Sequence, residues 1–426
     1  MSAQNTIRNI LRAWLIFATV FTFVQVPVAS FGTVDIYFFD LAVVFICILL
    51  PIYLISDSKI IIPRHRLLWI TSFGYFSLAI GLPVAGLIVY NNPIGYFVGD
   101  LRWIQIAVLC VGALSLYSQF VEGLIHDLEI AVAILLILHF LFFAVQYVDY
   151  TGIADTSIIL KFWYANQSAY GGTGYHIGRY AGASTNPSTL GLSAAVAIAI
   201  YGRALLVDRR GVGYLAIAAL LLLASGNRTS MVAVAGITAL LIVYRLRNIA
   251  SLDIPVKHIM YTISSLVSIA VVVYHYNIGR FGSPDRYIEL LQLIISPSHF
   301  IKISGRGDQW KAAVEQAQTY QFGTLSNPAW VFQDPGTIDS YFLLTFIQGD
   351  VLFLGVYILF LCSVFVVALR TLAHSINTFI PISFAVIITT SSLTQNFMTG
   401  LPGKLITAFI LVILACIWMS MQHQVN

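Results

Sequence analysis

The feature that most constrains this chain is a series of long apolar stretches that carry almost no charge. Residues 130–138, 214–224 and 351–369 are apolar on nearly every side of a helix. Only 9% of all residues are charged, whereas a soluble domain carries about 25%. Lipid accommodates such stretches because helices satisfy their backbone hydrogen bonds internally. The sequence therefore predicts an all-α polytopic integral membrane protein.

Windows of about 20 apolar residues predict about 12 transmembrane helices in a single transmembrane domain, residues 1–426. The expected spans are 12–31, 37–55, 67–90, 101–120, 128–148, 187–206, 212–225, 230–244, 258–276, 340–369, 376–393 and 405–420. The first thirty residues also resemble a cleavable signal peptide. The apolar stretch that starts at Ala13 is long for such a peptide, so we expect a retained first span.

Basic residues predict the orientation of the chain, because cytoplasmic loops carry an excess of Lys and Arg. If the N-terminus lies inside, the short outer loops hold only Arg102, Arg228 and Lys404. The basic residues that then fall inside are Arg8, Arg12, Lys59, Arg64, Arg66, Arg203, Arg209, Arg210, Arg245, Arg247, Lys257 and Arg370. Both termini are therefore expected to be cytoplasmic. The spans at 212–225 and 230–244 are short, and a re-entrant hairpin at that place is the alternative.

Two segments are too long and too polar to be simple turns, and both fall on the expected outer, periplasmic side. They are residues 149–186 and residues 277–339. Apolar residues recur at helical spacing within 288–295 and within 310–317, which predicts two short amphipathic helices along the membrane surface. Long loops of this kind often carry function.

Arginine is frequent on the expected outer side. The arginines there are Arg102, Arg179, Arg228, Arg280, Arg286 and Arg306. A guanidinium group binds phosphate oxygens with two parallel hydrogen bonds, so several at the headgroup level would suit a lipid-linked diphosphate. For each arginine taken singly, local pairing or extension of the side chain to the membrane surface is the alternative. The net charge is only +4, which disfavours nucleic acid as a partner.

Three short strings contain these arginines. Residues 178–187 place Arg179 and two glycines before Asn186–Pro187, and proline suits the first turn of a helix. Residues 225–230 place Arg228 between two expected spans. Residues 304–313 contain Arg306, and a short polar motif with Asp339 then leads into the next span.

In this order, on one side of a chain with about 12 spans, the strings resemble those of the O-antigen ligase and polymerase superfamily. These membrane glycosyltransferases use sugars linked to undecaprenyl diphosphate. The resemblance runs from about residue 175 to about residue 360. It implies a GT-C-like fold in the cytoplasmic (inner) membrane of a bacterium, with the active site facing the periplasm and with no metal or cofactor. It also implies undecaprenyl-diphosphate-linked oligosaccharide as donor and acceptor, and a chain-length regulator protein as a further partner.

One position favours a polymerase over a ligase. Ligases resemble one another in having a histidine just before the span that follows the large loop, where this chain has Asp339. Because no histidine lies between residues 300 and 373, the chain looks more like a Wzy-type polymerase than like a ligase that transfers glycan to lipid A core. A transporter or flippase of lipid-linked oligosaccharide is the alternative from another class, although transporters place charges near the bilayer midplane.

The resemblance implies that a sugar hydroxyl on one repeat unit attacks the anomeric carbon of another chain with inversion and expels undecaprenyl diphosphate. Fixed cationic donors would stabilise the charge that develops on this leaving group. We expect Arg228 and Arg306 to bind the diphosphate, with Arg179 and Arg280 next.

Two residues are candidates for the general base of this reaction. Asp339 is preferred, because the attacking hydroxyl needs a carboxylate or an imidazole within hydrogen-bond reach. Its alternative role is a helix N-cap. His176, in the first long loop, is the other outer histidine placed for chemistry. Its alternative roles are a contact to a sugar or a solvated loop residue.

Overall fold

The structure is a computed structural model and describes residues 3–25, 27–31, 34–56, 65–92, 94–117, 120–164, 175–176, 179–184, 186–248, 306–326, 340–372, 375–394 and 400–425. Its contacts divide the chain into two compact units, Met1–Ala131 with Ile301–Asn426, and Val132–Phe300. The span predicted at 258–276 and the amphipathic helix predicted at 288–295 lie outside the described residues.

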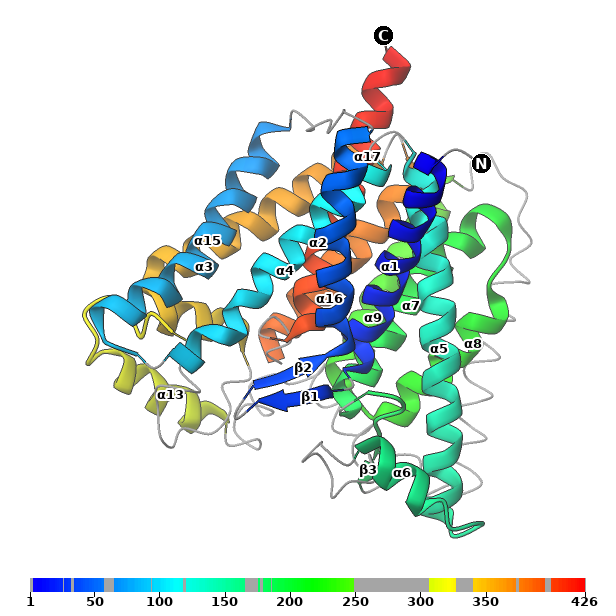
Figure 1. Cartoon of the computed structure of the whole chain (residues 1–426), viewed down its shortest axis with the longest axis horizontal. Helices are drawn as coiled ribbons and strands as arrows, with labels where there is room; N and C mark the ends of the chain where they lie inside the picture. The colour runs from blue at the N-terminus through cyan, green and yellow to red at the C-terminus, as the bar shows by residue number, and fades with distance from the viewer. Residues whose placement is uncertain are drawn as a thin grey trace. The chain divides into compact units, whose positions relative to one another are not determined.

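Helices dominate the first unit (Figure 1). They are α1 (Ala3–Val24), α2 (Phe38–Ser56), α3 (Arg66–Val89), α4 (Ile94–Tyr117), the start of α5 (Val121–Thr151), α13 (Arg306–Ala317), α15 (Tyr341–Leu372), η2 (Ile376–Thr378), α16 (Phe379–Thr394) and α17 (Leu401–Val425). The strands β1 (Pro27–Phe31) and β2 (Val34–Tyr37) form an antiparallel hairpin between α1 and α2.

The second unit contains the rest of α5 and three further apolar helices. Its elements are α6 (Ser157–Tyr164), β3 (Tyr175–His176), β4 (Arg179–Tyr180), α7 (Pro187–Asp208), α8 (Val212–Ser225) and α9 (Arg228–Asn248). The helix α7 is buried on nearly all sides and is rich in small residues, including Gly191, Ser193, Ala194 and Ala195. Small side chains let membrane helices approach closely, and α7 packs against both α8 and α9.

Among the described residues, eight helices are long and apolar enough to cross a membrane, and three shorter apolar helices accompany them. The predicted class of helical, polytopic membrane protein is therefore confirmed. The total number of crossings and the orientation stay predictions. The helix α8 has 14 residues and rises about 21 Å, less than the roughly 30 Å of a hydrocarbon core, so its crossing of the bilayer also stays a prediction.

The first predicted span, residues 12–31, is wrong at its C-terminal end. The helix α1 stops at Val24, Gln25 takes a left-handed conformation with φ of 51°, and β1 begins at Pro27. Proline has no N–H to donate and cannot continue a helix, so it is common just after a helix end. An apolar composition predicted a longer helix, but one proline ended it.

The helix α15 is two arms rather than one continuous span. Gly349 and Asp350 have non-helical backbone angles inside its 32 residues. In a straight helix Tyr341 and Tyr357 would be about 24 Å apart, yet their ring centroids lie 5.0 Å apart. The chain therefore doubles back at Gly349–Asp350. Residues 351–372 form the longer arm, which corrects the single span predicted over residues 340–369.

The helix α15 lies beside α3 (Figure 1). Aromatic rings and paired hydroxyls join it to α3 and to α16. The Tyr75 ring of α3 is stacked against Phe360 with centroids 5.0 Å apart. The hydroxyls of Tyr75 and Tyr341 lie 2.8 Å apart, and those of Tyr357 and Ser392 lie 2.6 Å apart. Hydrogen bonds of this kind join helices in an apolar environment, where hydrophobic attraction between helices is weak. Ser340, which precedes α15, is buried and donates to the Ser392 carbonyl at 3.1 Å.

Candidate functional site

The turn between α8 and α9 carries Arg228, the first of the arginines expected to bind a diphosphate. Gly226 ends α8 with a left-handed φ of 57°. The side chain of Asn227 caps α9 by accepting from the Ser230 N–H at 2.8 Å, and the Asn227 N–H donates to Ser225 Oγ at 3.1 Å. Arg228 is therefore fixed as the first residue of α9, at the positive end of the helix dipole.

Arg179 is bound to this same turn. Its Nε donates to the carbonyl oxygen of Ser225 at 3.2 Å. Its Cγ lies 3.3 Å from the position that a Cβ would occupy at Gly226. The structure thus brings together two of the four predicted diphosphate ligands, Arg179 and Arg228, from sequence positions about fifty residues apart.

Hydrogen bonds from α5 and α6 hold the segment that carries Arg179. Gln146 accepts from the Gly182 N–H at 3.0 Å and donates to the Tyr164 hydroxyl at 2.7 Å, and that hydroxyl in turn donates to the Gly182 carbonyl. All three residues lie in the interior, where an unpaired polar group is costly. Their mutual hydrogen bonds therefore fix the backbone of Gly182, three residues beyond Arg179.

A buried histidine completes this support. His139 Nδ1 accepts from the Ala183 N–H at 3.1 Å, and its Nε2 lies 3.1 Å from Ser193 Oγ. The Ser193 hydroxyl already donates to the Thr189 carbonyl, so Nε2 carries the proton and donates. His139 is thus a neutral imidazole with both nitrogens in use, and its role is structural.

Sequence reasoning missed His139 and Gln146, although a signal for them exists. The two polar residues stand seven positions apart in an otherwise apolar span, which is two helical turns and hence the same helix face. That face packs on the segment from Arg179 to Ser184.

The start of α7 follows the prediction made from Asn186 and Pro187. Asn186 caps the helix by accepting from the Thr189 N–H at 2.9 Å, and Pro187 is in the first turn. One turn later, α7 passes very close to the α8–α9 turn. A Cβ added at Gly191 would lie 2.7 Å from Asn227 Cβ and 2.9 Å from Ser225 Oγ.

Replacing Gly191 by alanine is therefore expected to push α7 away from the turn and to destabilise the protein by about 2 kcal/mol, a typical cost of overpacking. The measurement is the thermal unfolding midpoint of the purified protein in detergent. Gly213→Ala is the matched control, because a Cβ there meets nothing within 4 Å. Equal midpoints for the two variants would contradict the close packing at Gly191.

A second histidine, His176, is placed near Arg179 by a short hairpin. In this hairpin β3 pairs with β4, with His176 opposite Arg179 and Tyr175 opposite Tyr180. The Tyr175 hydroxyl donates to Asp149 Oδ2 at 2.8 Å. Burial, together with this hydrogen bond, raises the pKa of Tyr175 to about 12. The hairpin thus ties the candidate His176 to the end of α5.

Of the other three predicted site residues, the structure describes the backbone of one, Arg306. Arg306 is the first residue of α13 in the first unit, so the amphipathic helix predicted at 310–317 is confirmed as a helix. Arg280 and Asp339 lie outside the described residues. Within the described part of the chain, no group of three or more His, Cys, Asp or Glu side chains could hold a metal ion.

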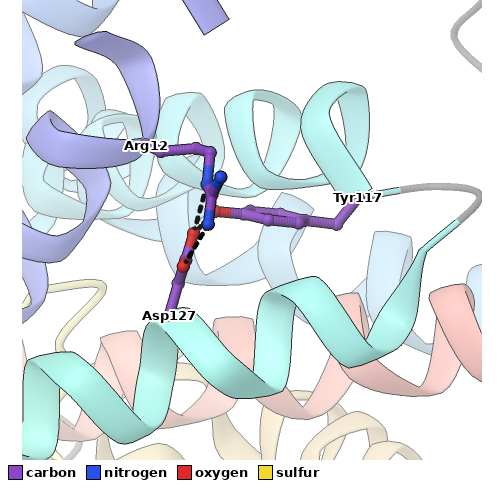
Figure 2. A network of polar contacts seen from close by, with 3 residues as sticks. All are labelled: Arg12, Tyr117 and Asp127. Atoms are coloured by element: carbon purple, nitrogen blue, oxygen red, sulfur yellow. Dashed lines mark hydrogen bonds and ion pairs between the residues drawn. The ribbon is translucent and has the colours of Figure 1, made fainter. Parts of the chain in front are cut away.

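The first unit contains a different charged cluster, formed by Arg12, Tyr117 and Asp127 (Figure 2). Arg12 donates through Nε to Asp127 Oδ2 at 2.8 Å and through Nη2 to Oδ1 at 2.7 Å. The Tyr117 hydroxyl also donates to Oδ2. A carboxylate so fully used by hydrogen bonds has little capacity left for chemistry. We interpret the cluster as a structural bond between α1, α4 and α5.

The fold and this site together define a helical polytopic membrane protein with an arginine-bearing turn next to a buried, hydrogen-bonded support. No protein-family model matches the chain. A search of curated proteins also found no match.

Proposed function

We propose that the protein is a membrane glycosyltransferase that joins undecaprenyl-diphosphate-linked repeat units into a surface polysaccharide such as O-antigen. The observation that carries the proposal is the bond between Arg179 and the turn that bears Arg228. An arginine bound to this turn and a second arginine within it, beside a helix N-terminus, supply the positive charge and the residue type that a diphosphate site needs.

In this proposal the arginines act mainly on the leaving group. As the bond between the anomeric carbon and the diphosphate breaks, negative charge grows on the diphosphate, and preorganised donors stabilise it. The support from Gln146 and His139 keeps Arg179 in place before the substrate arrives. The reaction is metal-independent and inverting. Arg306 and Arg280 stay predicted further ligands, and Asp339 and His176 stay the bases predicted from the sequence.

The proposal places the protein in the inner membrane of a bacterium, with the arginine turn facing the periplasm. The apolar helices support the membrane part of this statement, and the distribution of basic residues supports the orientation. Donor and acceptor are both undecaprenyl-diphosphate-linked oligosaccharides, and a chain-length regulator is the expected protein partner.

Reconstitution tests the function directly. The purified chain in liposomes would be given lipid-linked repeat units extracted from the strain that encodes it. A ladder of products that differ by one repeat unit, formed without any other enzyme, is the expected result. Translocation of the lipid-linked units without a ladder would contradict the proposal and indicate a flippase. Transfer of glycan only when lipid A core is added would indicate a ligase.

The choice of base is tested in the same assay. The sequence predicts that Asp339→Ala abolishes formation of the product ladder. His176→Ala is expected to retain more polymerisation activity than Asp339→Ala. Loss of activity in His176→Ala with normal activity in Asp339→Ala would show that Asp339 is not the base, and it would favour the ligase.

A further inference from the structure

The short helix α6 carries apolar side chains on two opposite faces. Leu160 and Tyr164, one turn apart, are fully buried against the protein. Ile158 and Phe162, also one turn apart, are 82% and 84% exposed, and the neighbouring Ile159 is exposed as well. A surface helix in contact with water would place polar residues there. The exposed apolar face of α6, made of Ile158, Ile159 and Phe162, therefore favours an apolar surrounding.

Hydrogen bonds place α6 beside the end of α5 (Figure 1). Residues 130–148 of α5 carry no Asp, Glu, Lys or Arg, and a helix of this length rises about 30 Å, the thickness of a hydrocarbon core. Asp149, which follows them, accepts from the Thr156 N–H at 2.8 Å, and the Thr156 hydroxyl donates to the Val145 carbonyl at 3.1 Å. The next residue begins α6. The helix α6 therefore starts where the apolar stretch of α5 ends, at the border between hydrocarbon and headgroups.

The two edges of α6 also suit the border of a bilayer. Lys161 is exposed and stands about 100° around the helix from the buried Leu160. A lysine at such an edge extends its ammonium group to lipid phosphates while its stem follows the apolar surface. Trp163 stands on the other edge, and tryptophan rings are enriched at membrane interfaces. Helices that lie in the plane of the interface combine these features.

The buried face of α6 is bonded to the segment that carries Arg179. The Tyr164 hydroxyl donates to the Gly182 carbonyl, and the Trp163 indole N–H donates to the Ala183 carbonyl at 3.3 Å. The same segment reaches the turn between α8 and α9 through the Arg179 Nε. A lipid contact on the far side of α6 would therefore set the depth of this segment in the membrane.

We propose that α6 is an interfacial helix whose exposed apolar face inserts into the acyl chains of the bilayer leaflet at the C-terminal end of α5. Lipid suits this face better than a second protein chain does, because three side chains cover far less than the roughly 800 Å² that each partner of a stable interface buries. The inference does not depend on the proposed function, since it uses only the burial and the hydrogen bonds of α5, α6 and the segment that follows them.

Site-specific photocrosslinking identifies what covers this face. The photoreactive amino acid benzoylphenylalanine replaces Phe162 in the full chain, which is then reconstituted in liposomes of phosphatidylethanolamine and phosphatidylglycerol. We expect a phospholipid adduct on this residue as the main product, detected by mass spectrometry. The same amino acid at the exposed position of Arg210 is the control and should give several-fold fewer lipid adducts. Crosslinks to protein, no adduct at all, or equal lipid adducts at both positions would overturn the proposal.

Polar substitution measures how much this contact stabilises the protein. The double variant Ile158→Gln with Phe162→Gln is expected to lower the thermal unfolding midpoint in nanodiscs by about 2 °C or more, because two amides would be moved out of water. Glutamine favours helix more than isoleucine or phenylalanine does, and both side chains are mostly exposed, so a lower midpoint reports lost lipid contact. Lys161→Gln on the same helix is the matched control and should leave the midpoint unchanged. An unchanged or higher midpoint in the double variant would show that water surrounds this face and would contradict the proposal.

Discussion

Replacing Arg228 by lysine is expected to lower the rate of repeat-unit polymerisation roughly a hundredfold, the usual effect of removing a preorganised donor to a developing anion. Lysine keeps the positive charge but replaces a planar, two-pronged donor by a single ammonium group. Because Arg228 is the first residue of α9 and Asn227 provides the cap, the exchange should leave the turn intact. Ladder formation and membrane yield are the two measurements.

A matched control is available in the same unit. Arg210 is 76% exposed and pairs with Asp208, so Arg210→Lys should leave activity unchanged. The sequence predicts that Arg306→Lys behaves like Arg228→Lys. Near-normal activity in both Arg228→Lys and Arg306→Lys would show that these arginines serve the fold and do not bind the substrate.

The second large effect concerns stability and the cluster of Figure 2. Asp127→Ala removes the acceptor shared by Arg12 and Tyr117. Breaking a buried ion pair typically costs about 3–5 kcal/mol. The Arg12 side chain is 36% exposed and can reach water, so we expect about 2 kcal/mol. The measurement is the thermal unfolding midpoint in detergent.

Asp208→Ala is the comparison for this variant, because it breaks an ion pair in which the Arg210 partner is exposed and should cost about 0.5 kcal/mol or less. Combining Asp127→Leu with Arg12→Leu should recover most of the lost stability, since two apolar side chains replace two charges. If Asp127→Ala were as mild as Asp208→Ala, the cluster would not be a structural bond between the three helices.

The places of most described helices could be predicted because the apolar stretches are local signals. The Asn186–Pro187 cap was also predictable, since capping depends on neighbouring residues. The doubling back of α15 was not predicted, because an apolar run of this length fits one long helix as well as two arms. The local sign was Gly349–Asp350, a glycine and a charge in the middle of the run.

The site could be predicted only in part. Sequence order indicated that Arg179 and Arg228 both stand near span ends, but their common turn depends on a contact between segments far apart in the chain. His139 and Gln146 were missed because the apolar composition of α5 hid two polar residues whose partners are also distant in sequence. Arg280 and Asp339, outside the described residues, stay predictions.

The most direct test of the account is the affinity of the arginine turn for a lipid diphosphate. The probe is undecaprenyl diphosphate in nanodiscs that contain the unmodified chain, the double variant Arg179→Gln with Arg228→Gln, or the control Arg210→Gln. The account predicts saturable binding by the first and the third. It predicts roughly a hundredfold weaker binding by the double variant, because each charge-assisted hydrogen bond contributes about 1.5–3 kcal/mol. Equal affinities in all three would contradict the assignment of this turn as the diphosphate site.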